Sequence, residues 1–585
     1  MIKRHNPSPN TSSFISISDP PTEGQTPEKQ RHNQGRETKP NKLLFPVAIA
    51  LIFVLILYIF LLYQGLPQQW TKMENANLHA AEHADAHVTG HDAAKKEHPP
   101  YIMVAPFVIL LLCIAIMPLI PVTAHWWEHN TNKFFVAGGL GALTLLYYFL
   151  GSAPVEQHLI EHKMVYPAEG GFAIVKTVFM NAIVVEFLPF IVLLFALFTI
   201  TGGIRICCGV KATPFVNCVI LLIGSVLASF IGTTGAAMLL IRPLLDMNRG
   251  RKYKAHTVVF FIFCVCNCGG CLTPLGDPPL FLGYLRGVPF EWTFNLCGQW
   301  AFVNLSLISF YYLWDDLWYY RHETQEYQGK VNDATQKLFS VSGWMLNVPL
   351  LFGVVAAVAF LDPSRVVPGT DWHPWYYLRE AVQLGLAAVS LLFTKVLIRQ
   401  ENVFNFLAIG EVAALFFGIF LCMQVPLQIL NVHGQNIVTC AQKTTGLSKE
   451  KLFFWSTGSL SSVLDNAPTY VVFFETAKSL TPNSEAELEA DSQWEKNTMG
   501  KWVSADGKRK LVPVTRGFIE HALLIAVSLG AVLLGAMTYI GNGPNFLIKA
   551  VAEQDGVAMP SFFGYMLYSC LILLPLLVVM TLIFL

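Results

Sequence analysis

The chain has 585 residues, of which 54% are hydrophobic and only 13% are charged, against roughly 25% charged in an average soluble domain. This composition predicts a membrane protein. The formal net charge is zero, so no basic surface indicates a nucleic-acid partner. The twelve cysteines lie mostly within apolar stretches, which argues against a disulfide framework.

Apolar stretches of about 20 residues, the length that crosses a hydrocarbon core of roughly 30 Å, recur along the chain. We expect an all-α polytopic membrane protein with about 11 to 13 membrane segments, some of them short or broken. This number excludes a single-span receptor. The clearest segments begin near Leu43, Tyr101, Phe134, Glu186, His256, Asn295, Met345, Tyr377, Val403, Gly517 and Ser561.

Three regions are predicted before the main body of the chain. Residues 1–42 are rich in Ser, Pro, Thr and Asn and carry seven Lys or Arg residues, which is typical of a disordered tail on the cytoplasmic side. Residues 43–63 are predicted to be a retained transmembrane helix, because no small-residue cleavage site follows closely. Residues 64–100 would then form an external linker.

Four histidines recur at every fourth position of this linker. On a helix they would form one stripe, which could bind Zn or Cu or sense pH. The alternative is an ordinary solvated tract. The four residues are His79, His83, His87 and His91.

Residues 214–241 form an apolar stretch of 28 residues, too long for one straight span and too short for two. Basic residues flank both of its ends, so both ends are predicted to be cytoplasmic. We therefore expect a re-entrant hairpin whose tip, "GTTG" at 232–235, lies at membrane depth. Irregular backbone at that depth must be buried in protein or line a watery cavity.

The chain aligns with itself in three places. The matches are "SFIGTT" from Ser229 with "SVLDNA" from Ser462, offset 233; "TPLGDPPLF" from Thr273 with "TYIGNGPNF" from Thr538, offset 265; and "EFLPFIVLLF" from Glu186 with "EVAALFFGIF" from Glu411, offset 225. We expect two inverted-topology repeats, 101–330 and 331–585, each with a re-entrant hairpin and a discontinuous helix. Such pairs are typical of secondary transporters, with the site at the repeat interface near the midplane.

The motifs "GTTGAAMLLIRPLL", "NCGGCLTPLGDPPLFLGYLRGVPFEWT" and "SSVLDNAPTYVVFFE" resemble those of bacterial sodium/proton antiporters of the NhaD type and of related citrate transporters in the ion transporter superfamily. The resemblance covers roughly residues 100–585 and implies a multi-pass protein of the bacterial inner membrane. Dicarboxylate carriers of this superfamily carry Ser-Asn-Thr at each hairpin tip. This chain has Gly-Thr-Thr at 232–234 and Asp-Asn-Ala at 465–467, which favours a cation.

Ionisable side chains are costly in hydrocarbon, so those present normally face the protein interior or a pathway. Asp277 and Asp465 lie beside broken backbone, where nearby oxygens can complete the shell that a hard cation such as Na⁺ prefers. The antiporter hypothesis depends most on Asp465, because the first hairpin tip has a neutral glycine at the corresponding position. For Glu186 and Glu411 a structural position near the head groups is the alternative. The predicted ion-binding residues are Asp465, Asn466, Asp277, Thr233, Thr234, Thr273, Asn267, Asn542, Glu411 and Glu186, with Thr538 as a further oxygen donor.

Two other features have competing interpretations. Arg242 and Arg286 flank the polar elements of the first repeat and are candidate anion contacts; the alternative is that they snorkel to the interface or cap the hairpin. The run "CVCNCGGC" at 264–271 resembles a metal site, but its small residues favour tight helix packing instead.

Sodium/proton antiport is the leading functional hypothesis, because burial disfavours a charged carboxylate and lets H⁺ compete with Na⁺ or Li⁺ for the same oxygens. Sodium-coupled uptake of citrate or another organic anion is the alternative. A third hypothesis, an intramembrane aspartyl protease that uses Asp277 and Asp465, gives the repeat no role. We thus expect a transporter rather than an enzyme, with no cofactor. Its predicted partners are Na⁺ or Li⁺, H⁺ and the lipid bilayer, and a homodimer is left open.

Two features of the sequence disagree about the side of the membrane on which residues 478–516 lie. The inverted repeat places this loop outside, yet it holds seven Lys or Arg residues, against the positive-inside tendency. Six acids between Glu485 and Asp506 offset them. We expect the loop to be external.

Overall fold

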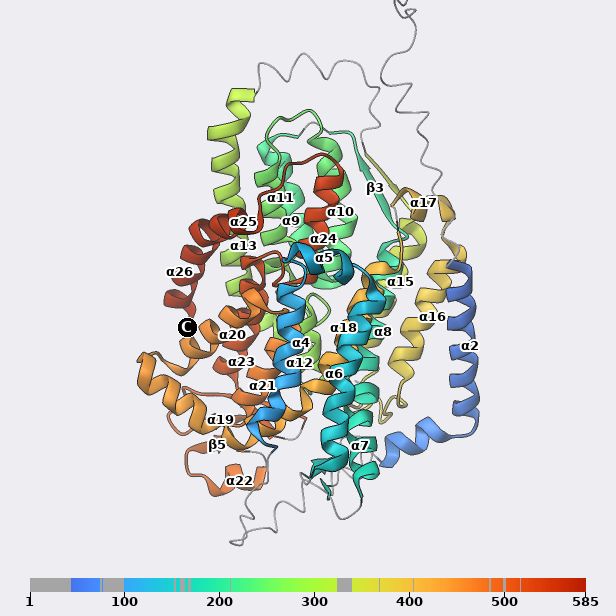
Figure 1. The fold of residues 1–585 in the computed structure, drawn as a ribbon, viewed down its shortest axis with the longest axis vertical. Helices are drawn as coiled ribbons and strands as arrows, with labels where there is room; N and C mark the ends of the chain where they lie inside the picture. The colour runs from blue at the N-terminus through green and yellow to red at the C-terminus, as the bar shows by residue number, and fades with distance from the viewer. Residues whose placement is uncertain are drawn as a thin grey trace, which may run out of the picture. The chain divides into compact units, whose positions relative to one another are not determined.

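Helices make up most of the described part of the computed structural model, and strands form four two-stranded antiparallel ladders there (Figure 1). The structure describes residues 44–73, 76, 99–151, 154–157, 164–166, 170–210, 212–323, 339–367, 369–402, 404–482, 485–497, 501–515 and 517–585. The N-terminal tail and the histidines at 79, 83, 87 and 91 lie outside these residues. Everything below belongs to one unit, Leu43–Leu585.

One group of helices, here called the flanking bundle, packs mainly through the pairs α6–α18, α8–α16 and α2–α16. A Cβ on Gly418 of α18 would lie 2.4 Å from the carbonyl oxygen of Ala137 in α6, so only glycine permits this approach. The members are α2 (Leu44–Tyr63), α4 (Ala105–Ile116), α6 (Asn130–Leu150), α7 (Gly171–Phe179), the π-helical η4 (Met180–Phe187), α8 (Leu188–Thr201), α15 (Trp344–Phe360), α16 (Leu378–Phe393) and α18 (Leu407–Cys422).

The other group, here called the site bundle, contains the two predicted hairpins and the two predicted interrupted helices. Its strongest contacts join α20 to α23, α9 to α10 and α12 to α21. The members are α9 (Pro214–Ile231), α10 (Thr233–Met247), α11 (Ala255–Cys264), η5 (Cys268–Cys271), α12 (Pro278–Leu285), α13 (Cys297–Trp314), α19 (Gln424–Thr445), α20 (Lys449–Val463), α21 (Asn466–Lys478), α23 (His521–Leu534), η8 (Gly535–Met537), α24 (Gly543–Gln554), α25 (Phe562–Tyr568) and α26 (Leu574–Phe584).

Shorter elements connect these helices. They are η2 (Tyr101–Val104), α5 (Pro121–Trp127), β1 (Val155–Glu156), β2 (Met164–Val165), β3 (Arg205–Cys208), η6 (Phe290–Leu296), η7 (Asp315–Tyr320), β4 (Phe339–Ser342), α17 (Val396–Glu401), α22 (Glu485–Ala490), β5 (Trp494–Lys496), β6 (Trp502–Ser504), β7 (Leu511–Val514), β8 (Gly517–Glu520) and η9 (Ser569–Leu573).

The all-α polytopic class is confirmed, but length alone finds fewer spans than expected. Among the described residues, five helices are long and apolar enough to cross a membrane, or up to seven if each bent pair counts as one span. Three shorter apolar helices add to these. The second halves of the two hairpins fall short because α10 has 15 residues and α21 has 13, whereas a full crossing needs about 20.

The two hairpins open toward opposite ends of the unit (Figure 1), which is the arrangement that inverted repeats require. The hairpin α9–α10 breaks at Gly232, whose φ of 81° suits glycine, and both of its outer ends point toward β3. The hairpin α20–α21 opens toward β5 and α22, at the opposite end of the unit from β3 and α17 (Figure 1). This arrangement supports the expectation that the loop after α21 faces the side opposite the first hairpin's ends.

The loop between α21 and α23 has structure that the sequence did not lead us to expect. Strands β5 and β6 pair, and so do β7 and β8. Their side chains form an apolar cluster of their own, separate from the main core. The cluster consists of Leu488, Trp494, Trp502, Leu511 and Phe518.

Candidate functional site

Asp277 lies where the first interrupted helix changes direction. It precedes α12, which begins at Pro278 and Pro279, because proline suits the first helical positions and cannot continue a preceding helix. Asp277 is only 1% exposed. The turn before it needs Gly276, because a Cβ there would lie 2.3 Å from the carbonyl oxygen of Gly270. The break therefore fixes a carboxylate inside the protein.

Three uncharged side chains from three other elements donate hydrogen bonds to this carboxylate. Thr233, at the tip of the first hairpin, donates to Oδ1 at 3.0 Å. Asn466, at the tip of the second hairpin, donates to Oδ2 at 2.6 Å, and Asn542 donates to Oδ1 at 3.2 Å. Within the described part of the chain, no Lys or Arg donates to Asp277. The site thus holds a carboxylate with neutral partners only.

The repeat alignment explains why these residues meet. Thr233 and Asn466 correspond at the offset of 233, and Asp277 and Asn542 correspond at the offset of 265. Asp277 and Asn542 each precede the second half of an interrupted helix. The site therefore consists of two pairs of corresponding residues at the interface between the repeats, and a charge is present in only one member of the second pair.

A second layer of amides holds Asn542 in place. Its Nδ2 also donates to Asn267 Oδ1 at 3.2 Å, and Asn267 donates to Asn545 Oδ1 at 2.7 Å. Asn545 in turn donates to the carbonyl oxygens of Gly535 and Thr538, both at 2.9 Å. Asn545 was not among the predicted residues, although its place three residues after Asn542 in "NGPN" puts it on the first turn of α24.

Two of the predicted threonines, Thr273 and Thr538, hold the broken backbone rather than contact Asp277. Thr273 donates to the carbonyl oxygen of Ser229, and Thr538 donates to that of Ser462 at 2.5 Å. These two bonds occupy corresponding positions in the two repeats. Each therefore ties an interrupted helix to the hairpin of its own repeat. Thr234 is half-buried next to Thr233.

Asp465 lies at the tip of the second hairpin, at the start of α21, and its side chain accepts a bond from the backbone N–H of Ala467 at 3.3 Å. It is partly exposed, whereas Asp277 is buried, and the two carboxylates are near enough to repel each other. Next to it, Asn466 Oδ1 is buried and has no hydrogen-bond partner among the described residues. An oxygen is thus left over for a ligand.

The two predicted glutamates lie outside this cluster. Glu186 forms an ion pair with Arg286 at 2.9 Å, and Glu411 forms one with Lys133 at 2.5 Å. Arg286 also forms an ion pair with Glu475 at 3.2 Å, so acids of the chain itself neutralise this arginine. Arg242 lies in α10 and is half-buried. The structure therefore brings neither glutamate nor arginine to Asp277.

Four helices begin at the cluster: α10, α12, α21 and α24. The N-terminus of a helix carries a partial positive charge that stabilises anions. In two of the four the residue before the first turn is an acid of the chain, Asp277 or Asp465. These helix ends thus help to hold the chain's own carboxylates in the anionic form.

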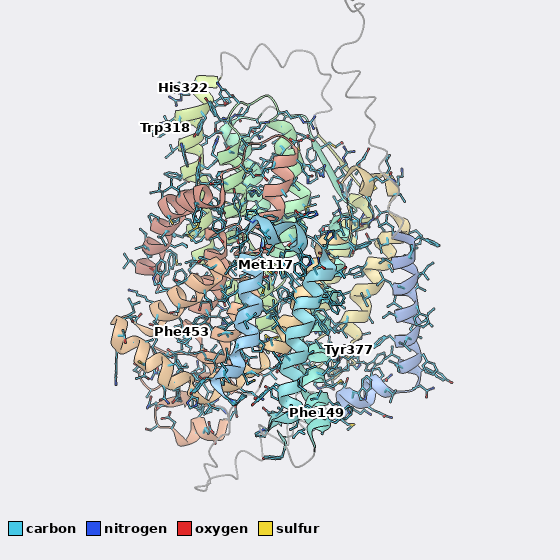
Figure 2. The ribbon with its side chains drawn as sticks, viewed as in Figure 1. Met117, Phe149, Trp318, His322, Tyr377 and Phe453 are labelled. Atoms are coloured by element: carbon cyan, nitrogen blue, oxygen red, sulfur yellow. The ribbon has the colours of Figure 1, made fainter. Side chains whose placement is uncertain are left out.

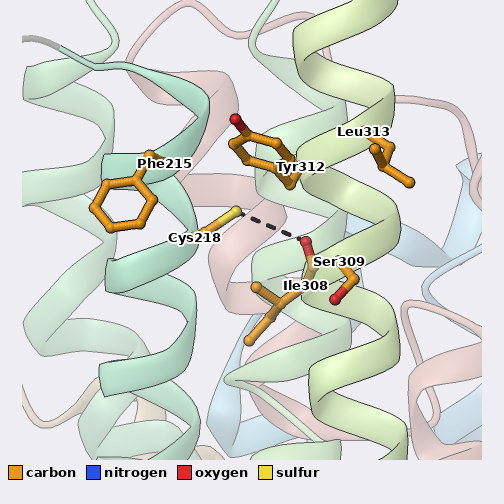
Figure 3. Close-up of a pocket in the computed structure, with 6 residues that line it drawn as sticks. All are labelled: Phe215, Cys218, Ile308, Ser309, Tyr312 and Leu313. Atoms are coloured by element: carbon orange, nitrogen blue, oxygen red, sulfur yellow. Dashed lines mark hydrogen bonds between the residues drawn. The ribbon is translucent and has the colours of Figure 1, made fainter.

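An apolar groove of about 420 Å³ lies elsewhere, between α9 and α13 (Figure 3). There the Cys218 thiol lies 3.7 Å from the carbonyl oxygen of Ile308. Phe215 and Leu313 are largely exposed at its rim, as expected for side chains that face lipid. No residue of the polar cluster lines this groove.

A family model described as "Putative citrate transport" matches residues 96–585. The match includes every element of both repeats and excludes α2. No match is found among the curated proteins.

Proposed function

The chain belongs to the family described as putative citrate transport and is a secondary transporter, and we propose that it exports Na⁺ or Li⁺ in exchange for H⁺ by alternating access. The observation that carries this proposal is the environment of Asp277. A buried carboxylate with neutral partners only attracts a cation and repels an anion.

The donor set around Asp277 suits a hard alkali cation. Such ions prefer oxygen ligands, and the cluster offers the Asp277 carboxylate, the Thr233 hydroxyl and the buried Asn466 Oδ1, which lacks a hydrogen-bond partner. Asp465 adds a second negative charge nearby. The ligands come from both repeats, so movement of one repeat element against another changes the exposure of the site to the two sides.

Proton exchange follows from the cost of an empty charged site. A buried carboxylate without a positive partner is unfavourable, so the site takes either a cation or a proton. Alternating access with one or the other bound then exchanges the two. The state in which Asp277 and Asp465 are both ionised and no cation is bound would be the least able to change its access from one side of the membrane to the other.

Sodium-coupled uptake of citrate or another organic anion is the second candidate, and the family description favours it. The convergence of four helix N-termini also favours an anion. Against it, acids of the chain already occupy two of these helix ends. A tricarboxylate would therefore need bound cations to offset Asp277 and Asp465.

The test is transport by the full chain in proteoliposomes. We expect Na⁺ and Li⁺, but not K⁺, to drive proton flux that a pH-sensitive dye reports, and labelled citrate to remain outside. Asp277→Asn should abolish the flux, because the amide cannot balance the cation. Na⁺-dependent citrate uptake without cation-dependent proton flux would contradict antiport and establish the second candidate.

A matched control is Asp246→Asn. Asp246 lies in the last turn of α10 and pairs with Arg249 at 2.8 Å. Its replacement removes the same charge from the same repeat, at the opposite end of α10 from Thr233. We expect this variant to keep the flux of the unmodified protein.

A further inference from the structure

A chain of charged side chains links the two bundles away from Asp277. Glu186 accepts from Arg286 Nη2 at 2.9 Å, and Arg286 Nε donates to Glu475 at 3.2 Å. The three side chains are only 10 to 13% exposed. A buried ion pair is costly to break, so a movement that separates its two groups requires one of the charges to be compensated in another way.

The ion pair with Glu186 crosses between the bundles. Glu186 belongs to η4, which packs against α8 and α18 of the flanking bundle. Arg286 follows the last turn of α12, the helix that begins next to Asp277, and Glu475 lies on α21, which packs against α12. A movement that carries α12 away from the flanking bundle would therefore separate Glu186 from Arg286.

Loss of the ion pair between the bundles would affect Glu475 and Glu186 differently. If the bundles move apart, Glu475 keeps Arg286 and also has Lys478, whose Nζ lies 4.0 Å from it. Glu186 would lose its cation. Arg379 of α16, which donates to the Tyr284 hydroxyl of α12 at 3.4 Å, is committed to its neighbour Glu380 at 2.6 Å. Glu186 would then be a buried and uncompensated carboxylate, unless it binds a proton.

The backbone around Glu186 departs from a regular helix. Residues Met180–Phe187 are π-helical, and such distortions occur frequently at functional sites. Tyr377 has a φ of 61°, the one positive value for a non-glycine residue in the described part of the chain, and its hydroxyl donates to Val184 O at 3.1 Å. Figure 2 shows Tyr377 toward the same end of the flanking bundle as Phe149. This contact holds η4 in the shape that directs Glu186 to Arg286.

We propose that Glu186 is a second proton-binding residue, and that its proton controls a latch between the bundles. Deprotonated Glu186 holds Arg286 and locks α12 to the flanking bundle. Protonated Glu186 releases Arg286 to Glu475, and α12 with Asp277 becomes free to move. This inference rests on alternating access in the proposed function, but not on which ion or anion is carried.

Hydrogen exchange on the full chain in lipid nanodiscs tests the latch without any transport assay. After correction for intrinsic rates, we expect the protection of 180–187 and 278–286 to fall about tenfold for each unit by which pH is lowered, as linkage to a single proton requires. Glu186→Gln should remove this dependence and leave both segments weakly protected at every pH. Glu186→Asp, which keeps the titrating group, should retain the dependence.

The matched control uses the corresponding glutamate of the other repeat. The double variant Lys133→Met/Glu411→Gln removes an ion pair that lies wholly within the flanking bundle, and it should keep the pH dependence of the unmodified protein. The proposal is overturned if Glu186→Gln keeps that dependence, or if the unmodified chain shows none. Because the measurement uses no Na⁺, Li⁺ or citrate and follows protection rather than flux, either result is independent of the outcome for antiport.

Discussion

Replacement of Asn466 tests how the two hairpin tips share Asp277. Asn466→Ala removes the donor that lies 2.6 Å from Asp277 Oδ2 and also the buried Oδ1 without a partner. A hydrogen bond to a charged group contributes about 1.5 to 3 kcal/mol. Its loss destabilises the ionised carboxylate, so protons compete better with Na⁺. At fixed pH the Na⁺ concentration for half-maximal exchange should therefore rise roughly 10- to 150-fold, since about 1.4 kcal/mol is a factor of ten.

The assay is Na⁺-dependent proton flux in proteoliposomes over a range of Na⁺ concentrations at constant pH. Asn466→Thr is the informative companion, because it introduces the residue type of the corresponding Thr233, which already donates to Asp277. We expect it to recover part of the loss. If the Asn466→Ala protein folds normally and its Na⁺ concentration for half-maximal exchange is unchanged, the inference that both hairpin tips stabilise the Asp277 carboxylate is refuted.

Three further predictions concern the framework of the site. Gly283→Ala should destabilise the protein by about 1 to 3 kcal/mol through overpacking, because a Cβ would lie 2.3 Å from the Tyr470 hydroxyl; a thermal midpoint in detergent equal to that of the unmodified protein would contradict this. Thr273→Val and Thr538→Val should each lower the free energy of unfolding by about 1 to 3 kcal/mol, because each leaves a serine carbonyl without its donor. A large loss of stability at only one of the two positions would show that the two repeats do not depend equally on this bond. Lys501→Cys, at an exposed position directly before β6, should gain labelling by a membrane-impermeant maleimide added outside cells, and labelling only after lysis would reverse the assigned topology.

Much of the architecture could be predicted because it depends on local sequence. Apolar length identifies the helices, and Gly or Pro residues mark where they break, as at Gly232 and Pro278. The repeat then pairs Thr233 with Asn466 and Asp277 with Asn542, which the structure brings to one place. A match of short motifs was sufficient to predict that these residues meet, because inverted repeats place corresponding residues at a common interface.

The partners of the charged residues could not be predicted in the same way. Glu186 and Arg286 are 100 residues apart, and Arg286 and Glu475 are 189 apart, so no local pattern links them. Sequence comparison also gave most weight to Asp465, since it stands alone in an apolar stretch. The structure instead places Asp277 at the centre, because burial and three donors depend on how the hairpin tips meet.

Equilibrium binding of radioactive sodium to the purified chain tests the central claim most directly, because it requires neither turnover nor orientation. At alkaline pH, where protons compete least, the unmodified protein and Asp246→Asn should bind Na⁺ saturably, and Asp277→Asn should bind none. Saturable binding by Asp277→Asn equal to that of the unmodified protein would contradict the assignment of Asp277 as the cation-binding carboxylate.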